Sequence, residues 1–288
     1  VKTIFGYPGG AIMPVYDALY DHLDKINHIL VRHEQGAAHA AQGFARVSGK
    51  VGVCLVTSGP GATNTITGIA DAMIDSTPIV VIAGQVGTGL LGTDAFQEVD
   101  LVGITQPISK WSYQIRRAED VAWAVSRAFY IARSGRPGPV VLDFAKNAQV
   151  EKTAYTPVDV DFIRSYDPNP DVDMECIKAA ADCINAAKRP LVLVGQGVEL
   201  GNAQQELKSF LEKGDLPCGC TLLGLSAIAT DHPLNKGMLG MHGNLGPNVK
   251  TNECDVLIAV GMRFDDRVTG DLAAYARQAK VIHLDIDP

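Results

Sequence analysis

Short, unbroken apolar runs alternate with helical patterns along most of this 288-residue chain. Residues 51–56, 78–83 and 140–144 are too short for buried helices and have no polar face. Strands of a parallel sheet have this character because helices cover both faces of the sheet. Helices are expected over 63–75 and 119–134, the latter with apolar residues at helical spacing. The sequence therefore predicts an α/β fold with a doubly wound, mostly parallel sheet.

A second α/β series follows a stretch of different character. Residues 151–172 hold several prolines and many acidic residues without a sustained period, as expected of a surface linker. Beyond it we expect helices over 174–187 and 202–213, and strands over 191–194, 255–260 and 280–285. Two doubly wound domains, residues 1–150 and 173–288, are thus predicted. Because the first and last residues resemble core strands, we expect the sequence to be a fragment of a longer polypeptide.

The composition indicates a globular protein that acts on small molecules. Hydrophobic residues make up 47% and charged residues 20%, with a formal net charge of -7, which disfavours nucleic-acid partners. No apolar stretch approaches the ~20 residues that a membrane span needs, and no secretory signal is recognisable. The six cysteines lack C-x-x-C spacing, so no metal site is expected, and reduced thiols in a cytoplasmic protein are favoured.

Three glycine-containing loops follow expected strands in the first domain: Gly6–Ala11, Ser58–Asn64 and Gly92–Glu98. Glycine permits close approach of a backbone or ligand, and a following helix offers free N–H groups. For Ser58–Asn64, phosphate binding and a tight turn capped by Thr63 are equally good interpretations. Loops at the ends of parallel strands meet at one edge of the sheet, which favours a shared ligand site.

A carboxylate stands at the same edge. Glu34 follows a strand-like run at 29–31 and opens a helix rich in alanine and glycine. From pattern alone, Glu34 either faces a ligand or merely complements the helix N-terminus. The spacing of His33, Glu34 and His39 differs from H-E-x-x-H, so zinc is disfavoured.

The second domain repeats this arrangement of loops. Gly195–Gly197 follows one expected strand, and Gly261–Val268, with two arginines and two aspartates, follows another. The charged residues form either a surface ion-pair cluster or a site for a phosphorylated cofactor. The apolar segment Met238–Gly243 is either a buried connection or a loop lying against a flat ring.

Taken in order, these motifs resemble the catalytic large subunits of the acetolactate synthase family, which use thiamine diphosphate. The matching segments are FGYPGGAIMPVYDAL, RHEQGAAHAAQGFAR, TSGPGATN, GTDAFQEVD, SGRPGPVVLD, MLGMHGN and VGMRFDDRVTG. The resemblance implies decarboxylation of pyruvate and condensation of the two-carbon unit with pyruvate or 2-oxobutyrate, in branched-chain amino-acid biosynthesis. It also implies a pyrimidine-binding domain, a central FAD-binding domain, and a C-terminal diphosphate-binding domain, holding Mg²⁺, that would follow Pro288.

By the same resemblance, Glu34 pairs with the aminopyrimidine ring of the cofactor, where it must be shielded from water. Phe96, Gln97 and Lys146 match positions near the reacting substrate. Gln97 would donate a hydrogen bond to oxyanion charge, whereas for Phe96 a packing role is an equally good interpretation. Further residues implied at the aminopyrimidine end are Pro8, Gly9, Gly10, Pro60 and Asn64. Residues implied to contact FAD, here a structural ligand, are Arg136, Gly195, Gln196, Gly197, Thr221, Leu222, Gly240, Met241, His242, Gly261, Met262, Arg263, Asp265, Arg267, Val268, Asp285 and Ile286.

A homodimer or homotetramer is implied, with 2-oxo acids as substrates and a small regulatory subunit as a further partner. One position departs from the family, because Gly87 stands where proline is common, and this predicts a looser turn. Pyruvate oxidase or another carboligase of the same cofactor class remains an alternative, as does a non-catalytic flavin-binding module for this chain alone. We expect this chain in isolation to make no acetolactate.

Overall fold

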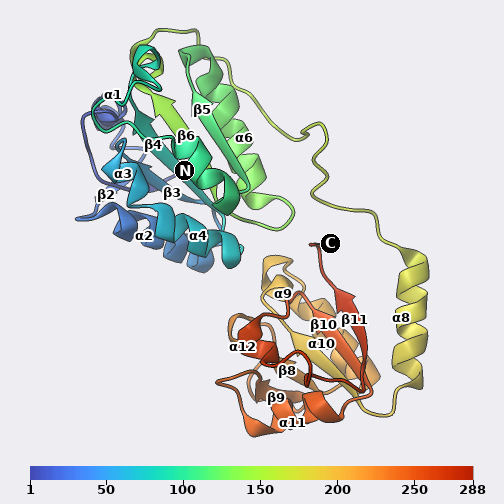
Figure 1. The fold of residues 1–288 in the computed structure, drawn as a ribbon. Coiled ribbons are helices and arrows are strands. Elements are labelled where there is room, and N and C mark those ends of the chain that lie inside the picture. The colour runs from blue at the N-terminus through green and yellow to red at the C-terminus, as the bar shows by residue number, and fades with distance from the viewer. Residues whose placement is uncertain (288) are drawn as a thin grey trace. The chain divides into compact units, whose positions relative to one another are not determined.

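The computed structural model describes residues 1–287. It divides into two compact units, Val1–Pro168 and Asn169–Pro288, each built around its own sheet (Figure 1). The first unit continues past residue 150, because Val160, Ile163 and Tyr166 pack against the core beside helix α6 (Val121–Arg133).

The first unit contains a six-stranded sheet in the order β2-β1-β3-β4-β6-β5, with every pair parallel. Its strands are β1 (Thr3–Gly6), β2 (Asn27–Leu30), β3 (Gly52–Val56), β4 (Ile79–Gln85), β5 (Trp111–Ile115) and β6 (Val140–Ala145). Its helices are α1 (Met13–Tyr20), α2 (Glu34–Ser48), α3 (Pro60–Thr63), α4 (Ile66–Ile74), α5 (Leu101–Thr105), α6 (Val121–Arg133) and α7 (Lys146–Val150). Short 3-10 turns cover Thr88–Leu90, Gln106–Ile108 and Ala118–Asp120.

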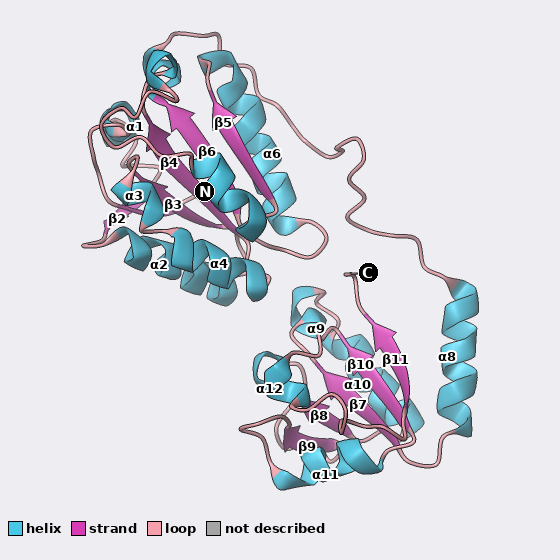
Figure 2. Cartoon of the chain, viewed as in Figure 1, coloured by secondary structure: helices cyan, strands magenta, loops and turns pink. Residues whose placement is uncertain are grey.

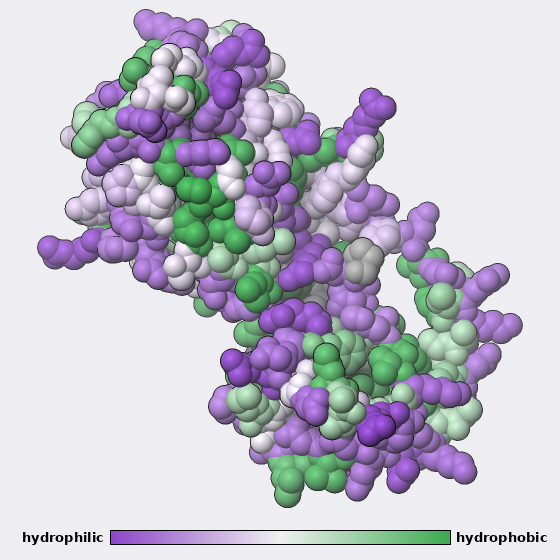
Figure 3. Space-filling model, viewed as in Figure 1, coloured by the Kyte–Doolittle hydropathy of each residue, from purple (hydrophilic) through white to green (hydrophobic). Residues whose placement is uncertain are grey.

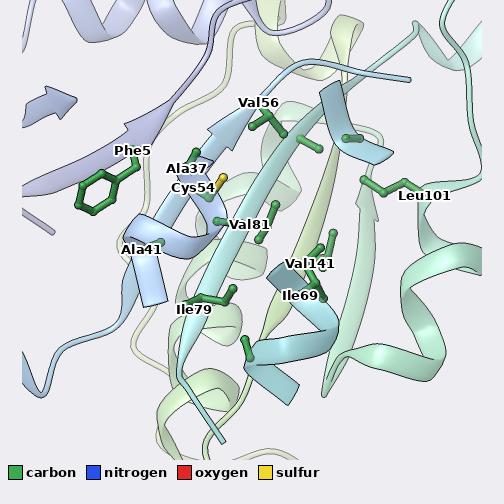
Figure 4. Close-up of a cluster of buried hydrophobic side chains, with 14 residues drawn as sticks. Phe5, Ala37, Ala41, Cys54, Val56, Ile69, Ile79, Val81, Leu101 and Val141 are labelled. Carbon is green, nitrogen blue, oxygen red and sulfur yellow. The ribbon is translucent and has the colours of Figure 1, made fainter. Parts of the chain in front are cut away.

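Helices cover both faces of this sheet, which confirms the doubly wound prediction (Figure 2). Successive residues of a strand point to opposite faces. On β4, Ile79 and Val81 pack towards α2 and α4, whereas Val80 packs towards α6. Figure 4 shows the first of these clusters, in which Ala37 of α2 lies over the sheet near Cys54.

Small residues bring α2 unusually close to the sheet. A Cβ atom added at Gly52 of β3 would lie 2.1 Å from the carbonyl oxygen of Ala41. Likewise, a Cβ at Gly68 of α4 would lie 2.6 Å from the side chain of Ala38. The alanines of α2, which face Gly52 and Gly68, therefore allow close contact of this helix with the sheet and with α4, and this fixes where its N-terminus lies.

The second unit contains a five-stranded parallel sheet in the order β11-β10-β7-β8-β9. Its strands are β7 (Pro190–Val194), β8 (Cys218–Cys220), β9 (Asn235–Met238), β10 (Val256–Val260) and β11 (Lys280–Leu284). Its helices are α8 (Met174–Ala186), α9 (Gly197–Leu200), α10 (Gln204–Gly214), α11 (Leu245–Glu253) and α12 (Asp266–Thr269), with a 3-10 turn at Leu222–Gly224. Two apolar clusters, one on each face of the sheet, form its core.

One expected helix is wrong in detail. The segment 63–75 forms two helices, α3 and α4, which are separated by Asn64 and Thr65. Thr63 does not cap the turn, because its hydroxyl donates to the carbonyl of Pro60 at the end of α3. The break leaves the Asn64 side chain free to turn towards α2.

Hydrophilic side chains cover most of the face drawn in Figure 3, with hydrophobic residues gathered in patches between them. Large exposed apolar side chains include Leu30 and Phe96 in the first unit, and Leu222, Met241 and Leu245 in the second. Phe96, Leu222 and Met241 are among the residues for which the sequence predicts ligand contacts. No helix within residues 1–287 is long and apolar enough to span a bilayer.

Candidate functional site

The loops of the first unit meet where its sheet changes direction of winding. The chain runs from β1 outwards to β2, and then crosses back to β3 on the other side of β1. Ligands of open α/β sheets bind at the carboxyl ends of the strands flanking such a switch point. The loops after β1, β2 and β3 follow the carboxyl ends of these neighbouring parallel strands and therefore lie at this edge.

Glu34 is the first residue of α2 and exposes only 9% of its surface. The amide nitrogen Nδ2 of Asn64 donates a hydrogen bond of 2.9 Å to Oε2 of Glu34. The ring nitrogen Nδ1 of His33 caps the helix by accepting the N–H of Gln35 at 3.2 Å. The carboxylate is thus held in place by a residue 30 positions later, whereas its other oxygen, Oε1, accepts no hydrogen bond from residues 1–287.

Two of the predicted glycine loops contact Thr57, a residue beside this carboxylate that was not predicted from the sequence. Added Cβ atoms at Gly9 and Gly61 would come within 2.5 and 2.6 Å, respectively, of the Thr57 side chain. The Thr57 hydroxyl also accepts the N–H of Ala11 at 3.3 Å. A Cβ at Gly61 would lie 3.4 Å from Oε1 of Glu34. The glycines therefore allow both loops to pack on Thr57, and Gly9, Thr57 and Gly61 form a cradle in which Gly61 lies next to the carboxylate.

The remaining predicted residues of this unit lie at the same edge of the sheet. Pro8, Gly10 and Pro60 are exposed at the tips of their loops. Lys146 begins α7, directly after β6, with an exposed side chain. Gly87, after β4, has φ -62°, so a proline would fit at this position without a change of φ.

The loop after β4 presents Phe96 and Gln97. Phe96 is 87% exposed, and Gln97 has a left-handed backbone with φ 58°. The backbone of Gln97 lies on Gly59, because a Cβ at Gly59 would be 2.6 Å from the Gln97 carbonyl oxygen. The structure thus brings the Gln97 backbone to the loop that borders Glu34, while the Phe96 side chain faces solvent.

A buried carboxyl group anchors the start and end of that loop. Asp143 of β6 is fully buried, and its Oδ2 accepts from Nε2 of Gln85 at 3.2 Å and of Gln114 at 2.7 Å. Gln85 also donates to the carbonyl of Val99 and accepts the N–H of Val86. Burial raises the pKa of Asp143 to about 6, although the two glutamine hydrogen bonds oppose this rise.

This shift predicts how stability depends on pH. Because the folded pKa of Asp143 lies above its ordinary value of 3.8, its contribution to stability is complete below pH 4 and lost as pH rises through 6. We expect Asp143→Asn to raise the free energy of unfolding at pH 8 by at most about 3 kcal/mol, and to leave it unchanged near pH 4. Denaturant unfolding at both pH values measures this. The exposed Asp17→Asn is the control, and a destabilised Asp143→Asn at pH 8 would contradict the prediction.

The second unit has its own switch point, between β7 and β10. The N–H of Gly197 donates to the carbonyl of Gly261 at 2.9 Å. A Cβ at Gly195 would lie 2.1 Å from that same carbonyl oxygen, and Gly261 has φ 59°. Two strand-end turns thus pack backbone against backbone at the switch point, where open α/β sheets bind their ligands. This fits the glycine pattern expected for a dinucleotide cofactor.

Other predicted flavin residues surround this point. The N–H of Met241 donates to the carbonyl of Arg267 at 2.7 Å, so the 240–242 loop lies beside α12. The Arg263 guanidinium is 3.7 Å from the Asp265 carboxylate, whose Oδ1 caps α12. The side chains that are exposed, and therefore accessible to a ligand, are Leu222, Met241, His242, Arg263, Arg267, Asp285 and Ile286. Those that are half-buried are Gln196, Thr221, Asp265 and Val268, and Met262 is buried.

Arg136 differs from the other predicted flavin residues in its location. It belongs to the first unit, where its guanidinium donates to Ser76 Oγ at 2.9 Å and to the Ile74 carbonyl.

Within residues 1–287, no group of three or more His, Cys, Asp or Glu side chains is arranged to hold a metal ion.

Comparison with known proteins agrees with this geometry. Residues 1–104 match the family described as "Thiamine pyrophosphate enzyme, N-terminal TPP binding domain", and residues 177–288 match its "central domain". The chain is 50% identical to a probable acetolactate synthase large subunit of Methanocaldococcus jannaschii, over all of this chain and 49% of that protein. It is 49% identical to the large subunit of acetolactate synthase isozyme 3 of Escherichia coli, over all of this chain and 50% of that protein.

The chain therefore spans about half the length of the curated relatives that it matches. A third example, an acetolactate synthase of Mycobacterium bovis, is 49% identical over all of this chain and 46% of its own length. The two family matches together cover most of the chain: the first contains strands β1–β4 of the first sheet, and the second contains all five strands of the second sheet. This chain belongs to the thiamine pyrophosphate enzymes and carries their N-terminal and central domains.

Proposed function

We propose that the protein to which this chain belongs is an acetolactate synthase. It would decarboxylate pyruvate and join the two-carbon unit to a second 2-oxo acid, either pyruvate or 2-oxobutyrate. The observation that carries the proposal is the buried Glu34, held by Asn64 inside a cradle of glycine loops. The names of the relatives and their identity along the whole chain support the choice of reaction.

The residues of the cradle fit the aminopyrimidine end of thiamine diphosphate. When bound, this cofactor supplies a carbon acid whose deprotonated form adds to the carbonyl of a 2-oxo acid. Glu34 would hold a proton between its Oε1 and a ring nitrogen, while Asn64 keeps Oε2 in place. Gly9 and Gly61 let their loops pack directly on Thr57, and Gly61 lies next to the Glu34 carboxylate. Burial excludes water, which would otherwise compete for this hydrogen bond.

The loop after β4 would supply groups for the substrate. Gln97 carries an amide that can donate to negative charge on the substrate oxygen, and Phe96 offers an exposed apolar surface. Lys146, at the same edge, would add positive charge to attract a 2-oxo acid carboxylate. These roles concern substrate binding and charge stabilisation, whereas proton transfer belongs to Glu34.

We further propose that the second unit holds FAD as a structural ligand. The turns at Gly195 and Gly261 provide the close backbone approach that a dinucleotide needs, and Arg263 and Arg267 are exposed beside them. Mg²⁺ would be bound with the diphosphate by residues outside this chain. We also propose that the protein assembles into a homodimer or homotetramer and binds a small regulatory subunit. A cytoplasmic location is proposed as well, and the buried free cysteines favour it.

Product analysis of the full-length protein tests this function. With pyruvate, thiamine diphosphate, Mg²⁺ and FAD, we expect acetolactate to form while the visible spectrum of the flavin stays oxidised under anaerobic conditions. Bleaching of the flavin by pyruvate would instead indicate an oxidase, because a carboligase needs no net electron transfer. Binding of both cofactors without consumption of pyruvate would contradict the proposal.

A further inference from the structure

A single side chain shapes the loop that carries Phe96 and Gln97. The carboxylate of Glu98 accepts the backbone N–H of Gly92 through Oε1, and that of Ala95 through Oε2 at 3.1 Å. The N–H of Glu98 in turn donates to the carbonyl of Ala95 at 2.9 Å. The loop thus folds around the carboxylate of Glu98 at its own C-terminal end. This carboxylate accepts backbone N–H groups that a helix or a strand would otherwise pair.

Two observations show that this wrapping constrains the loop. Asp94 and Gln97 have φ 57° and 58°, a left-handed conformation that non-glycine residues adopt when their surroundings require it. The backbone N–H groups of the loop, that of Gly92 foremost, hold the pKa of the Glu98 carboxyl below its ordinary value. Hydrogen bonds to an ionised acceptor are stronger than neutral ones. The charged form of Glu98 therefore organises the loop at neutral pH.

The loop also packs against the turn that precedes α3, at the edge of the sheet where Glu34 lies. The backbone of Gln97 lies against Gly59, where no Cβ could be accommodated. Gly59 begins the turn into α3, whose Gly61 borders the Glu34 carboxylate. A shift of the loop would therefore move Gln97 relative to Glu34. A small displacement of a residue that positions substrate weakens its contact with that substrate.

We infer that Glu98 is a positioning residue, which holds Gly92–Gln97 in the conformation that presents Phe96 and Gln97 to the 2-oxo acid. The substrate part of this inference rests on the proposed function. Glu98 itself does not contact substrate, because both of its carboxylate oxygens face N–H groups of the loop. The loop conformation can be tested without any assay of activity.

The test uses the full-length protein with three substitutions. Glu98→Gln keeps the size of the side chain but removes its charge, and Glu98→Asp keeps the charge but shortens the side chain. Glu119→Gln is the control, because Glu119 is an exposed partner of Arg117 on the same unit. Amide hydrogen exchange of the segment 92–95 reports on the loop. We expect it to be roughly 10-fold or more faster in Glu98→Gln, partly restored in Glu98→Asp and unchanged in Glu119→Gln.

Kinetics then connect the loop to the substrate. We expect Glu98→Gln to raise KM for pyruvate roughly 10-fold, with a smaller effect on kcat and unchanged affinity for thiamine diphosphate. Unchanged amide exchange would overturn the assignment of Glu98. Faster exchange with an unchanged KM would overturn its role towards substrate. If the wild-type protein made no acetolactate, the proposed function would fail, and amide exchange alone would still decide whether Glu98 holds the loop.

Discussion

Glu34→Gln is expected to lower acetolactate formation by roughly 100-fold to 10,000-fold in the full-length protein, the range over which a positioned acid or base contributes. Glutamine keeps the size and the hydrogen bond from Asn64 but cannot release a proton to a ring nitrogen. The loss should appear in kcat at saturating cofactor, with FAD still bound. Steady-state kinetics with pyruvate measures it.

Stability should distinguish this effect from misfolding. Removing a charge from the first turn of α2 changes the free energy of unfolding by at most about 1 kcal/mol. Glu119→Gln, on the surface of the same unit, serves as the control for loss of a negative charge. Retained turnover in Glu34→Gln would show that another group moves the proton.

Gly261→Ala is expected to abolish retention of flavin by the second unit. The alanine would have to adopt φ 59°, and its Cβ would lie 2.6 Å from the backbone of Gly197. The left-handed conformation costs about 1–2 kcal/mol, and the clash roughly 1–3 kcal/mol more. We therefore expect the free energy of unfolding of this unit to fall by about 2–5 kcal/mol. Calorimetry and the flavin absorbance that remains after gel filtration measure the two effects.

Gly246→Ala provides a matched control in the same unit. A Cβ at Gly246 would meet no heavy atom within 4 Å, and its backbone needs no positive φ. This variant should bind flavin and unfold like the wild type. If Gly261→Ala behaved in the same way, the two turns would not form the close contact that the site requires.

The sequence predicted the central strands because burial on both faces leaves an unbroken apolar run, as in β3 and β4. It did not predict β9, which has the polar sequence NKGM and lies at the edge of its sheet. Nor did it predict β5, another edge strand, or β8, which has only three residues. β8 and β9 become strands because a neighbouring strand pairs with them, and no local pattern records that pairing. β5 does carry a local signal, the alternation of apolar and polar residues in WSYQI.

The site residues likewise divide into those with a local sequence signal and those whose role depends on the folded structure. Glu34 was recognisable because it begins a helix directly after a strand, and the glycine loops were recognisable by composition. Thr57 acts through Ala11, 46 residues away, so its role depends on the folded sheet. Asp143 did leave a signal, because a carboxylate inside the apolar run VVLDFA has to be satisfied by partners. The anchoring role of Glu98 depends on loop conformation alone.

Proton exchange tests the central role of Glu34 most directly. The hydrogen on the thiazolium carbon of bound thiamine diphosphate can be followed by NMR after rapid mixing of the full-length holoenzyme with D₂O, without any 2-oxo acid present. We predict that this hydrogen exchanges at least roughly 100-fold faster in the wild type than in Glu34→Gln. Equal exchange rates in the two proteins would contradict the account.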